Sequence, residues 1–104
     1  MAYKISKASY AAAKRLGVSI KPSTVKGKKV DVFNAKGEKI ASIGALGMND
    51  FHLWKQKKGL EFAKRRRKAY KMRHEKDRHV RGSAGFYADK ILWTIILIIG
   101  VQFV

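Results

Sequence analysis

The first half of the chain alternates apolar and polar residues in a pattern typical of a β-hairpin. Residues 29–33 and 39–43 each alternate, which is the period of a strand with one buried face. Between them, residues 34–37 read Asn-Ala-Lys-Gly, and the final glycine can adopt the positive φ that a tight turn requires. The residues expected to face the core are Val30, Val32 and Ile40, with either Ile43 or Phe33. An isolated hairpin is marginally stable in water, so another element must cover its apolar face.

A short helix is predicted before the hairpin, over residues 6–16. This stretch is rich in alanine, which favours helix, and Ser6 is a suitable N-cap. Gly17 follows at the position where a C-cap glycine belongs. Residues 18–28 contain the only proline of the chain, Pro22, and are predicted to be irregular.

A longer, basic helical region is predicted after the hairpin. Asn49 or Asp50 can cap its start, and Gly59 is expected to interrupt it before a helix over residues 60–78. Its apolar positions form only a partial stripe, because charged side chains surround most of the helix. Residues 55–81 hold thirteen Lys and Arg against three Asp and Glu. The aromatic residues interleaved with this charge either belong to the core or stack on nucleic-acid bases: Phe51, Trp54, Phe62 and Tyr70.

The overall charge balance predicts a negatively charged partner. The 104 residues include 24 Lys and Arg against 7 Asp and Glu, a formal net charge of +17. Such a surplus repels further copies of the chain and attracts polyanions, and few acids at i,i+4 spacing neutralise it. Three partner classes remain open: nucleic acid, an anionic membrane surface and an acidic face of another protein. The side chains predicted to bind are Lys55, Lys57, Lys58, Lys64, Arg65, Arg66, Arg67, Lys68, Lys71 and Arg73.

The sequence offers no residue pattern that indicates catalysis or metal binding. There is no cysteine, which excludes disulfides, thiolate chemistry and Cys-type zinc sites. The histidines, His52, His74 and His79, are scattered, and no carboxylate pair is placed to complete a metal site. No Ser, His and Asp are arranged as a recognisable triad. We therefore expect a binding or structural protein without enzymatic activity, metal or cofactor.

The C-terminal stretch changes character abruptly and is uncharged from residue 91 to the end. As a helix, its fourteen residues would rise roughly 21 Å, short of the ~30 Å hydrocarbon core of a bilayer. Three interpretations remain open: a shallow or tilted membrane anchor, a segment buried against a partner protein, and part of the core of this domain. All three require the tail to be covered, because an exposed apolar tail would aggregate. The side chains predicted to dock in a partner or membrane are Ile91, Leu92, Trp93, Ile95, Ile96, Leu97, Ile98 and Ile99.

Five motifs follow one another in order between residues 29 and 93. They are the hairpin 29–44, Gly47-Met48-Asn49-Asp50-Phe51, Arg65-Arg66-Arg67-Lys68-Ala69-Tyr70-Lys71-Met72-Arg73-His74, Ser83-Ala84-Gly85-Phe86-Tyr87 and Leu92-Trp93. This series resembles a family of short basic proteins encoded by nucleocytoplasmic large DNA viruses, such as those infecting algae and amoebae. The family brings no established activity, so the resemblance implies a context: a protein of the virion or the virus factory. Such virions have an icosahedral capsid over an internal membrane and a packed DNA genome.

Together these patterns predict an α+β protein with an N-terminal helix, one β-hairpin, a long basic helix and an apolar C-terminal tail. Its expected segments are 1–28 (helix and linker), 29–82 (hairpin and basic helix) and 83–104 (tail). We expect a minor capsid (cement) protein, assembled in the host cytoplasm, that links viral capsid proteins to each other or to inner-membrane lipid. The alternative is a basic protein that neutralises and packages viral DNA through the same side chains.

Overall fold

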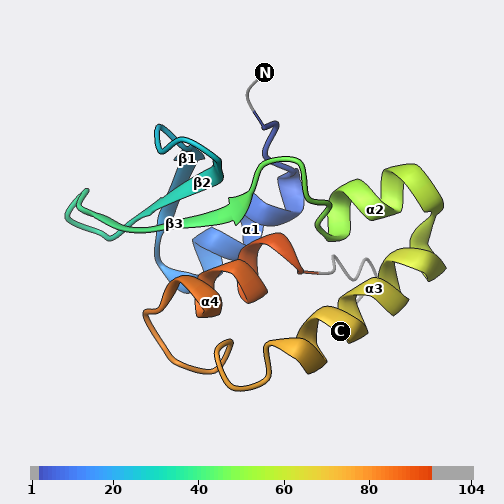
Figure 1. The fold of residues 1–104 in the computed structure, drawn as a ribbon. Coiled ribbons are helices and arrows are strands. Elements are labelled where there is room, and N and C mark those ends of the chain that lie inside the picture. Colours follow the sequence, from blue (N-terminus) through green and yellow to red (C-terminus); the bar gives the residue numbers. More distant parts are fainter. Residues whose placement is uncertain (1–2, 95–104) are drawn as a thin grey trace.

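Helices and an antiparallel sheet make up the α+β fold of residues 3–94, the part of the chain that the computed structural model describes (Figure 1). The sheet order is β1-β2-β3. The elements are α1 (Lys7–Leu16), β1 (Ser19–Pro22), β2 (Lys28–Phe33), β3 (Lys39–Ala45), α2 (Phe51–Lys58), α3 (Leu60–Arg73), α4 (Ala84–Tyr87) and the π-helix η1 (Ala88–Leu92). The predicted fold class is therefore confirmed.

The N-terminal helix forms where its capping residues predict it. The Ser6 side chain accepts a hydrogen bond from the Ser9 amide at 3.1 Å, and so satisfies one of the donors that a helix start leaves free. At the other end Gly17 is left-handed, with φ of 76°, and its N–H bonds to the carbonyls of Ala13 and Lys14. Both ends of the helix are thus set by local chemistry.

The segment predicted to be irregular contains a third strand, β1. It pairs antiparallel with β2, with Ile20 opposite Val32 and Pro22 opposite Val30. Proline is tolerated there because β1 is an edge strand and its residue 22 is the last of the strand. Four residues with a single buried side chain, Ile20, give too weak an alternation to reveal a strand in the sequence.

The hairpin of β2 and β3 is confirmed, but one of its core assignments is wrong. Val30 pairs with Ile43 and Val32 with Ala41, and the side chains of Val30, Val32 and Ile43 are at most 2% exposed. Ile40 is 38% exposed. Residues three apart on a strand point to opposite faces, so Ile40 and Ile43 cannot both face the core, and the register selects Ile43.

The basic region forms a helical hairpin of α2 and α3, as the interrupting glycine predicts. Gly59 has φ of 90° and ψ of 169°, a conformation open essentially only to glycine. Asp50, not Asn49, caps α2, with its side chain accepting from the Leu53 amide at 3.1 Å. The second helix ends at Arg73 rather than at residue 78, because the chain then enters turns.

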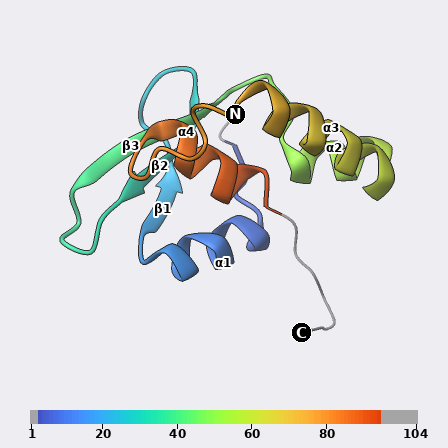
Figure 2. The same ribbon diagram turned by 90° about the horizontal axis from the view of Figure 1, so that it is seen from below.

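The C-terminal elements α4 and η1 pack against α1 and β3, between the sheet and α3 (Figures 1 and 2). The Ser9 hydroxyl donates to the Ile91 carbonyl at 2.7 Å, and the Arg67 Nε donates to the Trp93 carbonyl at 2.6 Å. Residues 84–93 are therefore built into the domain. The principal core cluster draws on nearly every element: Ile5, Ala13, Ile20, Val30, Val32, Ile43, Phe51, Ala63, Ile91, Leu92 and Trp93.

This packing corrects part of the predicted docking segment. Ile91, Leu92 and Trp93 are 0%, 4% and 8% exposed, which leaves almost no side-chain surface for docking in a partner protein or a membrane. Their apolar character serves the core, one of the three interpretations left open by the sequence. The other predicted docking residues lie outside the described residues: Ile95, Ile96, Leu97, Ile98 and Ile99. Within residues 3–94 no helix is long and apolar enough to cross a bilayer.

Candidate functional site

Three of the seven acidic side chains are buried inside the fold and are unavailable to balance the surface charge. Asp31, Asp50 and Asp89 are 2%, 1% and 1% exposed. A buried carboxylate is costly unless hydrogen bonds or ion pairs compensate it. Each of the three therefore collects donors from separate parts of the chain.

Asp31, in the central strand β2, links β3 to the loop that follows β1. Its carboxylate accepts from the Ser23 hydroxyl at 2.5 Å, the Ser42 hydroxyl at 2.7 Å and the Thr24 amide at 3.1 Å. Lys39 Nζ lies 3.4 Å from Oδ2 of Asp31. Burial by itself would raise the pKa of Asp31, but the hydrogen bonds from Ser23, Ser42 and Thr24 outweigh it and hold the pKa well below its usual value. The group is anionic in the folded protein and serves structure.

Asp50 connects the N-terminal segment, β2 and α2. Besides capping α2, its carboxylate lies 3.0 Å from Lys29 Nζ and accepts from the Tyr3 hydroxyl at 2.5 Å. Lys29 is itself 3% exposed, so this ion pair is fully internal. Burial, and then the charge of Asp50, raise the pKa of Tyr3, and its hydroxyl remains a donor.

Asp89, in η1, is close to cations from α3, from the turns that follow α3 and from η1 itself. Lys71 Nζ lies 2.7 Å from Oδ1, while Lys90 Nζ and Arg78 Nη1 lie 3.5 and 3.7 Å from Oδ2. Burial opposes ionisation, but the hydrogen bond and charge of Lys71 lower the pKa of Asp89 below its usual value. The predicted binding residue Lys71 is thus engaged inside the molecule.

The surface consequently carries a large surplus of cations without carboxylate partners. All charged residues fall within the described part of the chain, and there only six of the 24 Lys and Arg lie within 4.0 Å of a carboxylate. Those six are Lys29, Lys39, Lys64, Lys71, Arg78 and Lys90. The remaining eighteen, spread over the helices, strands and loops of residues 3–94, have no such partner.

The helical hairpin holds all ten predicted binding side chains. Eight of them are exposed: Lys55, Lys57, Lys58, Lys64, Arg65, Arg66, Lys68 and Arg73. Arg67 is half-buried, as is Lys71, and burial lowers the pKa of both. The structure thus places most of the predicted set on one accessible element and assigns two members to contacts that hold η1 and Trp93 against α3.

An open cleft of about 750 Å³ lies between β3, the helical hairpin and the α4–η1 segment. We call it the cleft. Both tryptophans of the chain line it, together with Tyr70. Tyr70 stacks on Trp93 with ring centroids 4.5 Å apart, and burial followed by the charge of Asp89 raises the pKa of Tyr70 to about 12. The cleft therefore has an aromatic lining that carries no charge at neutral pH.

Basic side chains stand beside this aromatic lining. Lys28, Arg66 and Arg73 line the cleft and have no carboxylate within 4.0 Å among the described residues. The Arg66 guanidinium lies 5.2 Å from the centre of the Trp54 ring, within cation–π range. The cleft was not predicted from the sequence, because the segments that form its walls are far apart in the chain. One signal was available: residues 66, 70 and 73 share one face of α3 by helical spacing.

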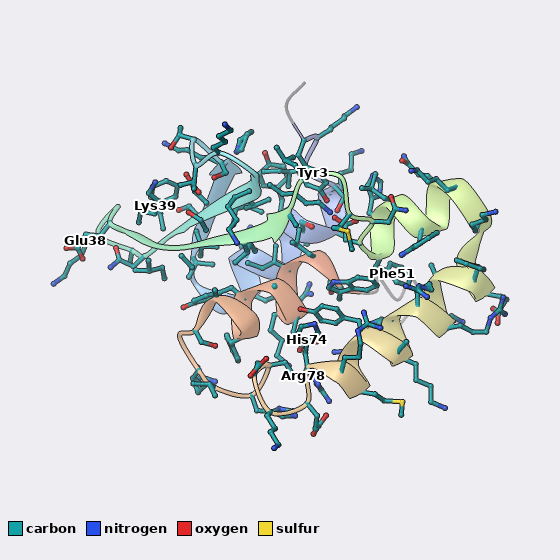
Figure 3. All side chains as sticks on the ribbon, in the orientation of Figure 1. Tyr3, Glu38, Lys39, Phe51, His74 and Arg78 are labelled. Atoms are coloured by element: carbon teal, nitrogen blue, oxygen red, sulfur yellow. The ribbon has the colours of Figure 1, made fainter. Side chains whose placement is uncertain are left out.

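His74 and Ser83, two polar residues of the cleft, are not arranged as a base and an activated nucleophile. His74, which lies between α3 and α4 (Figure 3), is 3.6 Å from Asp77. Ser83, which also lines the cleft, donates its hydroxyl to the Val80 carbonyl at 2.7 Å and accepts from the Phe86 amide at 3.1 Å. It is thus engaged as the N-cap of α4. Within residues 3–94, no group of three His, Asp or Glu side chains is placed to hold a metal ion.

No protein-family model, curated protein or solved structure matches the chain. The resemblance to short basic viral proteins therefore remains a prediction from the motifs. Functional inference rests on the charge distribution and the cleft.

Proposed function

We propose that the chain is a non-enzymatic structural protein of a large DNA virus particle. In this role it is a minor capsid (cement) protein of the virion that binds anionic faces of capsid proteins, or inner-membrane lipid headgroups, and so holds the shell together. The motif series supplies the viral context. The charge distribution supplies the physical reason for binding to anionic surfaces.

One observation carries this proposal: eighteen basic side chains lack a carboxylate partner within the described fold, while three of the seven acids are buried. Like charges gathered on a domain of this size repel one another and destabilise the compact state. An anionic surface against the helical hairpin relieves this repulsion, and arginines can bind carboxylates or phosphates through two parallel hydrogen bonds. Binding therefore stabilises the fold as well as the assembly.

The test locates the chain in purified particles of the virus that encodes it. We expect it to remain with empty shells after the genome is released, at a fixed ratio to the major capsid protein. Cross-links should join Lys55, Lys57 or Lys58 on α2 to acidic regions of capsid proteins. Loss of the chain together with the genome, at constant shell composition, would reject the cement role.

A second candidate function is genome packaging, and the spread of the unpaired cations favours it. These side chains occur on α1, the sheet and the helical hairpin rather than in one patch, which suits a polymer that wraps around the protein. Such binding to duplex DNA would be insensitive to sequence and steeply salt-dependent. Release of the chain with the genome in the particle experiment is the result that this candidate predicts.

The part of the C-terminal tail beyond the described residues has its own test in the same particles. We propose that residues 95–104 dock in a neighbouring protein or in the bilayer. Deleting them should reduce incorporation into shells or association with the internal membrane, while the fold of residues 3–94 persists by circular dichroism. Unchanged incorporation and membrane association would remove the docking role.

A further inference from the structure

The cleft combines an aromatic surface with a basic one. Its lining includes the rings of Trp54, Tyr70 and Trp93, and its basic side chains include Arg66, Arg73 and Lys28. Two carboxylates also line the cleft: Asp50 is paired with buried Lys29 at 3.0 Å, whereas Asp77 is 70% exposed and lies 3.6 Å from His74 Nδ1, so the basic side chains outnumber the one exposed acid. A ligand that complements the cleft therefore has a flat, weakly polar body and a negative charge attached to it.

The rings of the cleft differ in what they can offer to such a ligand. Trp93 is 8% exposed and stacks on Tyr70, so these two form a fixed wall. Trp54 is only half-buried; Phe62 packs against it at 5.0 Å and tilted by 51°. Trp54 is therefore partly accessible, and the Arg66 guanidinium lies over its ring, 5.2 Å from the centroid. Aromatic surface next to arginine is the arrangement that binds unpaired bases, with the base stacked and the phosphate paired.

We propose that the cleft binds single-stranded nucleic acid, with an unpaired base against Trp54 and neighbouring phosphates on Arg66 and Arg73. A volume of about 750 Å³ is within the range of sites that enclose small organic ligands. A duplex keeps its bases stacked and cannot place one in the cleft, and a membrane surface cannot enter a concave site. An acidic peptide offers the charge without the flat ring. The cleft shares Arg66 and Arg73 with the basic set of the cement role, but that role makes no use of the tryptophan rings, so a preference for strands with bases tests the cleft alone.

The two tryptophans provide a direct readout, since they are the only ones in the chain and both line the cleft. The full chain is titrated with an eight-nucleotide oligothymidylate and with an abasic strand carrying the same number of phosphates. We expect the thymidylate to quench tryptophan fluorescence and to bind about tenfold more tightly than the abasic strand, as stacking of a base implies. Equal affinities, or equal quenching by the abasic strand or by polyglutamate, would overturn the proposal.

Matched variants separate stacking from charge. Trp54→Leu should abolish the preference for thymidylate over the abasic strand, with the remaining Trp93 as reporter and circular dichroism as a check of folding. The double change Arg66→Gln with Arg73→Gln should weaken both strands more than Lys57→Gln with Lys58→Gln, which removes the same charge from exposed positions outside the cleft lining. If both double variants weaken binding equally, Arg66 and Arg73 have no specific role in the cleft. The particle experiment is unaffected by these outcomes, so the two proposals can fail separately.

Discussion

Asp89 is a buried acid at the junction between α3 and η1. Its carboxylate is within 4.0 Å of Lys71, Arg78 and Lys90, and Asp89→Asn would leave these cations without their shared counter-charge. Removing one partner of a buried ion pair costs about 3–5 kcal/mol. Because Lys71 is 20% exposed and water can reach it, we expect a loss near the lower end, about 3 kcal/mol, in the free energy of unfolding measured with urea at pH 7.

Glu61→Gln is the matched control for this prediction. Glu61 pairs with Lys64 on the surface of α3 at 3.6 Å and is 79% exposed, and exposed pairs of this kind contribute little. We expect its free energy of unfolding to stay within about 0.5 kcal/mol of the parent chain. If the two substitutions have equal effects, Asp89 does not hold the junction.

The buried carboxylates also set how stability depends on pH. The pKa values of Asp31 and Asp89 are lowered in the folded chain, whereas an unfolded Asp titrates near about 3.9. Their contribution is therefore full above about pH 5 and is lost as the pH falls through 3.9 toward the lower folded values. Urea unfolding between pH 6 and pH 2 should show this decline, and Asp31→Asn should make it shallower. A parent profile that stays flat below pH 5 would contradict the assignment.

At the scale of single residues, the sequence could not reveal these buried acids. An aspartate in an alternating strand such as β2 is expected to face solvent, and only the placement of Ser23, Thr24 and Ser42 around Asp31 makes its burial favourable. The error at Ile40 has the same origin. Its neighbour Ile43 is equally apolar, and the register with β2 decides which of them is buried.

At the scale of elements, local signals predicted α1, the helical hairpin and the β2–β3 hairpin, but not α4 or η1. Ser6, Gly17 and Gly59 mark helix boundaries by capping and backbone conformation, which depend on near neighbours alone. The strand β1 and the burial of residues 91–93 depend instead on contacts with distant segments. An apolar run fits a membrane, a partner or a core equally well until its neighbours are known.

The close packing of η1 on β3 gives a prediction at this scale. A Cβ built on Gly44 would lie 2.8 Å from Leu92 Cδ1 and 2.9 Å from Lys29 Cδ, and Gly44 has φ of 78°. Gly44→Ala should therefore combine backbone strain with overpacking and reduce the free energy of unfolding by about 2–4 kcal/mol. Urea unfolding monitored by circular dichroism measures this loss.

Gly37→Ala isolates the strain component of that loss. Gly37 has a similar φ of 84°, but nothing lies within 4 Å of its hypothetical Cβ. We expect this control to lose about 1–2 kcal/mol from the unfavourable φ alone. Should Gly44→Ala cost no more than Gly37→Ala, η1 does not pack against β3 as described.

At the scale of the whole molecule, composition predicted that the surface charge is positive. The fold explains why so few acidic side chains remain on that surface. A net charge of +17 is a property of the sequence alone, but the withdrawal of Asp31, Asp50 and Asp89 into the interior is a property of the fold. The cleft is likewise a feature of the assembled chain, because β3, the helical hairpin and the α4–η1 segment are separated along the sequence. Helical spacing places residues 66, 70 and 73 on one face of α3, but it does not show which other segments complete the cleft.

The salt dependence of polyanion binding tests the central claim most directly. The full chain is titrated with duplex DNA, polyglutamate and phosphatidylserine vesicles between 50 and 200 mM salt. We expect measurable binding to at least one of them at 50 mM and, for six or more phosphate contacts on DNA, a loss of about 10³-fold in affinity by 200 mM. If the chain is folded and soluble but binds none of the three polyanions at 50 mM salt, the claim that it binds an anionic partner is wrong.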